Sequence, residues 1–231
     1  MSFALLIIFM FVAFGLTTLF RKWIDIPTLL AVAIGCACNA NLFTAITHPI
    51  SAGPFIFSFE IVLYTLFIYT IVVRILDYGN KAAKVMTFTS IAAIIISAFI
   101  ELVVSLSIIG FTADVFKRFS YYIFSSIGTI LGVWLMIVIT INLKKKSVSS
   151  YIIIPISLVA CSVVHSVIYY GGYALVNISS GFEFYPWNAV LGTVIGKAVC
   201  IGLSLICYLI NKTVWIPNTL IKMKKDQERE Q

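Results

Sequence analysis

The feature that most constrains this chain is a series of seven apolar segments, each about as long as a lipid bilayer is thick. An α-helix needs about 20 consecutive apolar residues to cross the hydrocarbon core. Windows of that length with few charges fall at residues 2–20, 27–46, 55–73, 85–109, 121–141, 151–176 and 188–210. The sequence therefore predicts an all-α fold, a polytopic transmembrane helical bundle. We expect six to seven spanning helices, six if residues 2–20 pack peripherally or one span is re-entrant.

Composition supports the membrane assignment. Of the 231 residues, 61% are hydrophobic and 11% are charged, whereas a soluble domain has about 45–50% apolar and about 25% charged residues. A water-soluble fold and intrinsic disorder are therefore excluded. All five cysteines lie inside apolar segments, so we expect small packing residues and no disulfide. The net charge of +7 comes mainly from basic residues in short connections and the tail, and it predicts no nucleic-acid partner.

The placement of the basic residues predicts an orientation, because cytoplasmic connections carry an excess of Lys and Arg. With the N-terminus outside, thirteen basic residues fall in the cytoplasm and two outside, and Lys197 lies within a segment. We expect an N-out/C-in multi-pass protein of a bacterial cytoplasmic (inner) membrane, since the composition, rich in Ile and Lys, is typical of AT-rich bacterial genomes. Residues 1–212 would form the bundle, with 2–20 as an uncleaved anchor, and 213–231 a short basic and polar cytoplasmic tail.

Two local patterns have structural interpretations. Residues 111–120 mix phenylalanines with charged residues, which predicts a short amphipathic segment on the outer surface. Glycines four residues apart recur at Gly128/Gly132 and Gly192/Gly196. Small residues at this spacing let helix backbones approach closely, so we expect these pairs to serve helix packing.

Ionisable and amide side chains inside the apolar segments are the candidate ligand-binding residues, because a charge at the bilayer centre costs about 2.5–3.5 kcal/mol on insertion scales. With the predicted orientation, all of them fall in the outer half of the membrane or at its midplane. This asymmetry predicts a polar cavity open to the outside. The candidates are Asn39, Asn41, Glu60, Glu101, His165 and Lys197.

Each candidate also has a purely structural interpretation. Glu60 is shallow enough to extend its carboxylate to the outer interface. Lys197 is too deep for that and would pair with Glu101 or Glu60. His165 is consistent with a hydrogen-bonded packing residue, and Asn39 and Asn41 with interhelical hydrogen bonds.

Motifs of enzyme chemistry are missing from the sequence. It has two histidines, no H-E-x-x-H or G-x-S-x-G motif, no Gly-rich phosphate loop and no Cys/His cluster. We therefore expect neither an enzyme nor a metal or cofactor site, and assign no catalytic residue.

Several short motifs occur in order over residues 35–212. They are Ala40-Asn41, Gly53-Pro54, Tyr78-Gly79-Asn80-Lys81-Ala82-Ala83, Lys117-Arg118, Ser125-Ser126, Lys144-Lys145-Lys146 and Gly196-Lys197. In order and spacing this series resembles the vitamin-uptake-transporter-like family that contains the queuosine-precursor transporters. That family is related in design to the substrate-binding subunits of energy-coupling-factor transporters. The chain differs at Val72, Ile75 and Leu76, where the family carries acidic residues.

The resemblance and the polar residues together favour a transport protein. It would take up a small polar solute, either base-like (a deazapurine or queuosine precursor) or vitamin-like. The alternative is a non-transporting membrane partner subunit, sensor or regulator whose intramembrane polar residues are structural. The expected partners are the lipid bilayer, a small-molecule substrate, and either a second copy of this chain or other membrane subunits.

Overall fold

The computed structural model describes residues 50–52, 55–57, 60–110, 112–178 and 187–210, together with the helical residues Ile8 and Val12. Helices dominate this part of the chain. They are α3 (Glu60–Tyr78), α4 (Asn80–Ile109), α5 (Ala113–Lys145), α6 (Ser150–Val176) and α7 (Trp187–Ile210). A short antiparallel hairpin of β1 (Ile50–Ala52) and β2 (Phe55–Phe57) precedes them, and it pairs Ile50 with Phe57.

All five of these helices are long and apolar enough to cross a membrane. The prediction of a multi-pass helical membrane protein is confirmed at this level. The predicted segments 2–20 and 27–46 and the tail 213–231 lie outside the described residues, apart from Ile8 and Val12.

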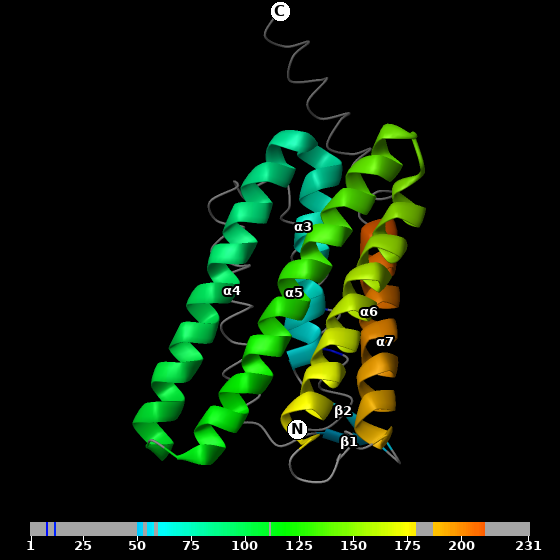
Figure 1. The fold of residues 1–231 in the computed structure, drawn as a ribbon. Coiled ribbons are helices and arrows are strands. Elements are labelled where there is room, and N and C mark those ends of the chain that lie inside the picture. The colour runs from blue at the N-terminus through cyan, green and yellow to red at the C-terminus, as the bar shows by residue number, and fades with distance from the viewer. Residues whose placement is uncertain are drawn as a thin grey trace, which may run out of the picture.

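The helices run side by side, with α4 at one edge of the described bundle and α7 at the other (Figure 1). Helix α3 lies behind α5 in this view and packs against each of α4, α5, α6 and α7. Every residue from Ile61 to Ile75 except Tyr64 is buried. A helix that is apolar on all faces is typically a buried one, so α3 is the central helix of the described bundle.

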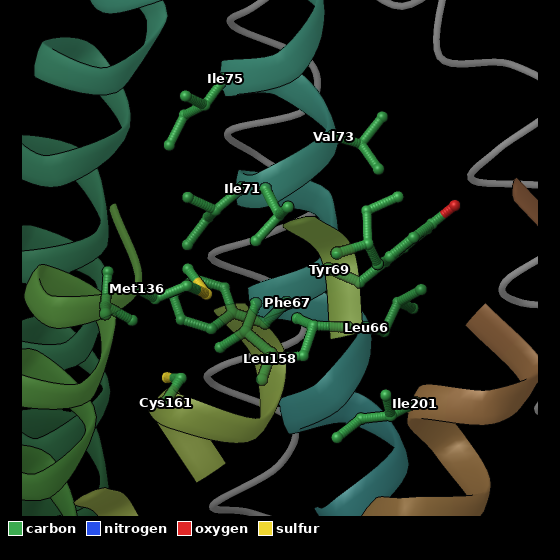
Figure 2. Close-up of a cluster of buried hydrophobic side chains, with 14 of the residues drawn as sticks. Leu66, Phe67, Tyr69, Ile71, Val73, Ile75, Met136, Leu158, Cys161 and Ile201 are labelled. Carbon is green, nitrogen blue, oxygen red and sulfur yellow. The ribbon is translucent and has the colours of Figure 1, made fainter. Parts of the chain in front are cut away.

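Side chains of α3 form the middle of the hydrophobic core. Phe67, Ile71 and Ile75 of α3 lie toward α5 and α6, where Met136, Leu158 and Cys161 meet them (Figure 2). Ile201 of α7 belongs to the same cluster and packs on its α7 side (Figure 2). This core fixes the positions of the four helices that carry the polar site.

The third predicted span, residues 55–73, is wrong at both ends. Residues 55–57 form strand β2, and the helix begins at Glu60 and continues to Tyr78. Only Gly79 separates α3 from α4, with φ 70° and ψ −148°, a conformation open essentially to glycine alone. Arg74 follows the predicted span directly and is one of the thirteen basic residues expected in cytoplasmic connections and the tail. It is instead a buried residue of α3, with its guanidinium 5.1 Å from the centre of the Tyr78 ring.

The end of α3 is held by a basic residue of the Lys144-Lys145-Lys146 run. The Lys144 ammonium donates hydrogen bonds to the carbonyl oxygens of Ile75 at 3.0 Å and Leu76 at 2.7 Å. Carbonyls in the last turn of a helix have no partner within the helix. The Lys144 ammonium binds the Leu76 carbonyl and is a second donor to the Ile75 carbonyl, which also accepts from the Gly79 N–H at 2.9 Å. Its charge also complements the helix dipole.

Residues 113–120 do not form a separate surface segment. Helix α5 begins at Ala113 and runs without interruption to Lys145, so the charged residues of this stretch belong to its first two turns. The mixture of aromatic and charged residues that suggested an interfacial segment belongs to the start of a long helix.

The packing role of Gly128 and Gly132 is confirmed. A β-carbon at Gly132 would lie 2.9 Å from the carbonyl oxygen of Cys161, and one at Gly128 would lie 3.2 Å from the Cα of His165. The backbones of α5 and α6 therefore approach as closely as glycine allows. The described cysteines, Cys161, Cys200 and Cys207, are buried and free, as expected.

Candidate polar site at Lys197

The candidate site is centred on Lys197, in the interior of α7. This side chain is 6% exposed. It lies ten residues into the helix, about 15 Å from the end at Trp187 at about 1.5 Å per residue. That distance puts the ammonium group near the middle of the span, where a cation is most costly.

Two residues of α6 bind the ammonium group. Lys197 Nζ donates to Ser166 Oγ at 2.9 Å and lies 3.3 Å from His165 Nδ1. An ammonium group has three donors and no acceptor, so Nδ1 must accept. We therefore assign the neutral imidazole with its proton on Nε2, which is 3.2 Å from Ser125 Oγ of α5 and donates to it.

Helices α5 and α6 approach closely at His165 because residue 128 of α5 is a glycine. Gly128 comes nearly one turn after Ser125 on α5, and its missing side chain leaves room for the backbone of His165. The small-residue pattern of α5 thus has a consequence for the site, since it brings Ser125 within hydrogen-bond distance of the imidazole.

Aromatic rings surround the polar groups. The Tyr64 ring of α3 lies 4.7 Å from the His165 ring, and its centre is 5.3 Å from Lys197 Nζ, within the range of a cation–π interaction. The Tyr169 ring is parallel to the imidazole, with centroids 6.0 Å apart. The Tyr64 hydroxyl lies 3.3 Å from Cys161 Sγ. Groups from α3, α5, α6 and α7 therefore converge on one polar cluster.

Of the six candidate residues, the structure describes the side chains of His165 and Lys197. His165 and Lys197 are in contact. Glu60 is the first residue of α3, one helical turn before Tyr64. Glu101 belongs to α4, at the opposite edge of the described bundle from α7 (Figure 1). Asn39 and Asn41 lie outside the described residues.

Ser166 and Tyr169 of this cluster escaped the sequence analysis, and Ser125 entered it only as part of the Ser125-Ser126 motif. Serine and tyrosine are common in membrane helices, so residue type alone carries no signal. A usable signal exists in the spacing, because Ser162, His165 and Ser166 fall at i, i+3 and i+4 and so share one face of a helix.

The chemistry of the cluster is that of hydrogen bonding and charge. It offers an ammonium, hydroxyls and an imidazole, next to flat aromatic faces. Among the described residues no group of three or more His, Cys, Asp or Glu side chains could hold a metal ion. The arrangement can bind a small polar solute, or it can join four helices through their polar groups.

Fold and site together define a multi-pass helical membrane protein with a polar cluster buried within the bundle. Comparison of the chain with protein-family models, with curated proteins and with solved structures finds no match.

Proposed function

We propose that this protein is a bacterial inner-membrane transport protein that takes up a small polar solute. The observation that carries the proposal is Lys197, buried at mid-span among polar and aromatic groups of four helices. A cation at this depth is expensive, so ionisable groups inside membranes are candidate ligand-binding or transport residues by default. The site's flat rings and hydrogen-bonding groups suit a planar, base-like or vitamin-like solute such as a deazapurine.

The distribution of basic residues supports an N-out/C-in orientation for the proposed transporter. The α3–α4 and α5–α6 connections lie at the same end of the bundle (Figure 1). Lys81 and Lys84 follow the α3–α4 connection. Lys144, Lys145 and Lys146 lie where α5 ends and the α5–α6 connection begins. An end rich in lysine is expected in the cytoplasm.

Ligand binding is tested with the purified protein in detergent. Purines, deazapurines and vitamins are screened for a rise in melting temperature, in the wild type and in the variants Lys197→Met and Lys145→Met. A ligand at 100 times its Kd stabilises the folded state by about 2.7 kcal/mol. We expect one solute class to raise the melting temperature of the wild type and of Lys145→Met, whose side chain is exposed, and not that of Lys197→Met.

Transport is tested separately with the solute that binds. Proteoliposomes containing the wild type should accumulate the labelled solute, and those containing Lys197→Met should not. Binding without accumulation contradicts transport, and no binding by any compound contradicts a solute site at Lys197.

A second function is favoured by the same hydrogen bonds. They link Lys197 of α7 to His165 and Ser166 of α6, and His165 to Ser125 of α5. Such contacts serve equally to fix helix packing in a non-transporting partner subunit, sensor or regulator. That function predicts no solute binding, lower thermal stability of Lys197→Met, and copurification of the wild type with another membrane protein or a second copy.

A further inference from the structure

Positive charge gathers at the end of the bundle where α3 joins α4 and α5 joins α6. Both connections lie at this end (Figure 1). The Lys144 ammonium, which binds the end of α3, would lie 3.8 Å from a β-carbon at Gly79, so the end of α5 meets the start of α4. The side chains described here carry five positive charges and one negative charge: Arg74, Lys84, Lys144, Lys145, Lys146 and Asp77. This end of the bundle therefore attracts anions.

Lys84 places one of these charges at the edge of an apolar span. It is the second residue of the stretch Ala83–Ile100, which is long and apolar enough to cross a membrane. Its side chain is exposed, and its ammonium forms no hydrogen bond or ion pair within the part of the chain that the structure describes. A cation at this depth lies where the headgroups of a bilayer meet the acyl chains.

Lys84 shares one face of α4 with large exposed apolar side chains. Phe88, Ile95 and Phe99 follow it at i+4, i+11 and i+15, so the four residues lie within about 60° around the helix. We call them the α4 stripe. Phe88 is 76% exposed, the highest value among the described large apolar residues, and Ile95 is 59% exposed. Helix α4 stands at one edge of the described bundle (Figure 1), where exposed apolar side chains are suited to contact with lipid.

We propose that the α4 stripe binds an anionic phospholipid, with the phosphate at Lys84 and an acyl chain along Phe88 and Ile95. Eleven residues separate Lys84 from Ile95, about 16 Å along the helix. One leaflet of the hydrocarbon core is about 15 Å thick, half of about 30 Å. The stripe between these two residues therefore matches one lipid from its phosphate to the end of its chain. The inference requires only that the helices span a membrane and does not depend on the proposed solute.

The charge of the headgroup decides which lipid is preferred. A zwitterionic headgroup carries its own ammonium, which neutralises the phosphate and is repelled by Lys145 and Lys146 at the same end. An anionic headgroup keeps its net negative charge for the basic residues. One Lys or Arg near a membrane surface strengthens the attraction to anionic lipid by about a factor of five.

The test measures which lipid lies beside residue 95. The full chain carries a single tryptophan introduced by Ile95→Trp, and each native tryptophan is replaced by phenylalanine. It is reconstituted into vesicles of phosphatidylcholine and phosphatidylglycerol with identical acyl chains, one of the two lipids being brominated. Bromine quenches tryptophan fluorescence on contact, so quenching by each brominated lipid in turn gives the ratio of their affinities. We expect phosphatidylglycerol to be preferred about fivefold.

Two lysine variants locate the preference. Lys84→Gln should reduce the ratio of affinities to about one, because it removes the charge at the head of the stripe. Lys145→Gln is the matched control, since it removes the same charge from another exposed lysine at the same end. It should leave the ratio beside residue 95 unchanged, because Lys145 belongs to α5. Circular dichroism and melting temperatures show that each variant is folded.

A second measurement keeps the native tryptophans. The wild type and Lys84→Gln in detergent are titrated with phosphatidylglycerol, phosphatidylcholine and glycerol phosphate, and the melting temperature is followed. Phosphatidylglycerol should raise the melting temperature, and more so in the wild type than in Lys84→Gln. Glycerol phosphate has the charge of the headgroup without the acyl chains and should have no effect.

Three results overturn the inference. The first is equal affinity of the two lipids beside residue 95. The second is an equal effect of Lys84→Gln and Lys145→Gln, which assigns the preference to the whole positive end. The third is equal stabilisation by glycerol phosphate and phosphatidylglycerol, which assigns a site for soluble phosphate esters. None of these results bears on a solute at Lys197, whose binding has its own assay.

Discussion

Two adjacent glycines of α6 should respond in opposite directions to the same substitution. A β-carbon at Gly172 would overlap Cγ of Phe124 and lie 2.6 Å from its Cβ, so the whole ring would have to move. A β-carbon at Gly171 would meet nothing within 4 Å. Overpacking costs about 1–3 kcal/mol, and replacing glycine by alanine in a helix gains about 1 kcal/mol.

These magnitudes predict whether each variant is more or less stable than the wild type. Gly171→Ala should be about 1 kcal/mol more stable than the wild type. Gly172→Ala should be up to about 2 kcal/mol less stable, because the clash involves the base of the Phe124 side chain and cannot be relieved at its tip. The difference of about 3 kcal/mol corresponds to about 6–12 °C in melting temperature for a chain of this size.

The assay is thermal unfolding of both variants and the wild type in one detergent, followed by circular dichroism and by a cysteine-reactive dye. The dye reports exposure of the buried cysteines on unfolding. Equal melting temperatures for the two variants, or a Gly172→Ala protein more stable than the wild type, would refute the close packing of α5 and α6.

Three further substitutions test other contacts by the same melting measurement. Lys144→Ala removes two hydrogen bonds to the end of α3 and should cost about 1–3 kcal/mol, whereas Lys145→Ala, at an exposed neighbour, should be neutral; equal effects would contradict the capping role. Gly79→Ala forces a side chain into a positive-φ conformation and should cost about 1–3 kcal/mol, and an unchanged melting temperature would contradict the one-residue junction. Thr140→Val removes the donor to Ser157 and should cost about 1 kcal/mol, and a more stable variant would show that this buried hydrogen bond has no net value.

For the five apolar segments that fall within the described residues, the sequence correctly predicted a long apolar helix, but it misplaced some of the helix ends. Windows 121–141, 151–176 and 188–210 lie within or closely match α5, α6 and α7. The errors at α3 have a physical cause. Arg74 was assigned to a connection because a charge inside a span is costly, and a single glycine was not recognised as a complete connection between two helices.

For the polar site, the sequence predicted individual residues and could not predict their contacts. Lys197 and His165 stand out because each is rare inside an apolar helix. Their contact depends on the packing of α6 against α7, which no local pattern encodes. The spacing of Ser166 from His165 places both on one face of α6, but the hydrogen bond from Lys197 to Ser166 is seen only in the structure.

The burial of α3 has a consequence for how the protein is made. Helices α5, α6 and α7 follow α3 in the chain, so during synthesis α3 enters the bilayer before these neighbours exist and is first surrounded by lipid. Two of its hydroxyls suit that stage, because Thr65 and Thr70 donate to carbonyls of their own helix. Membrane helices form first as independent units and associate afterwards. The interior of the finished bundle is therefore built around a helix whose sequence has to be stable in lipid as well as in protein.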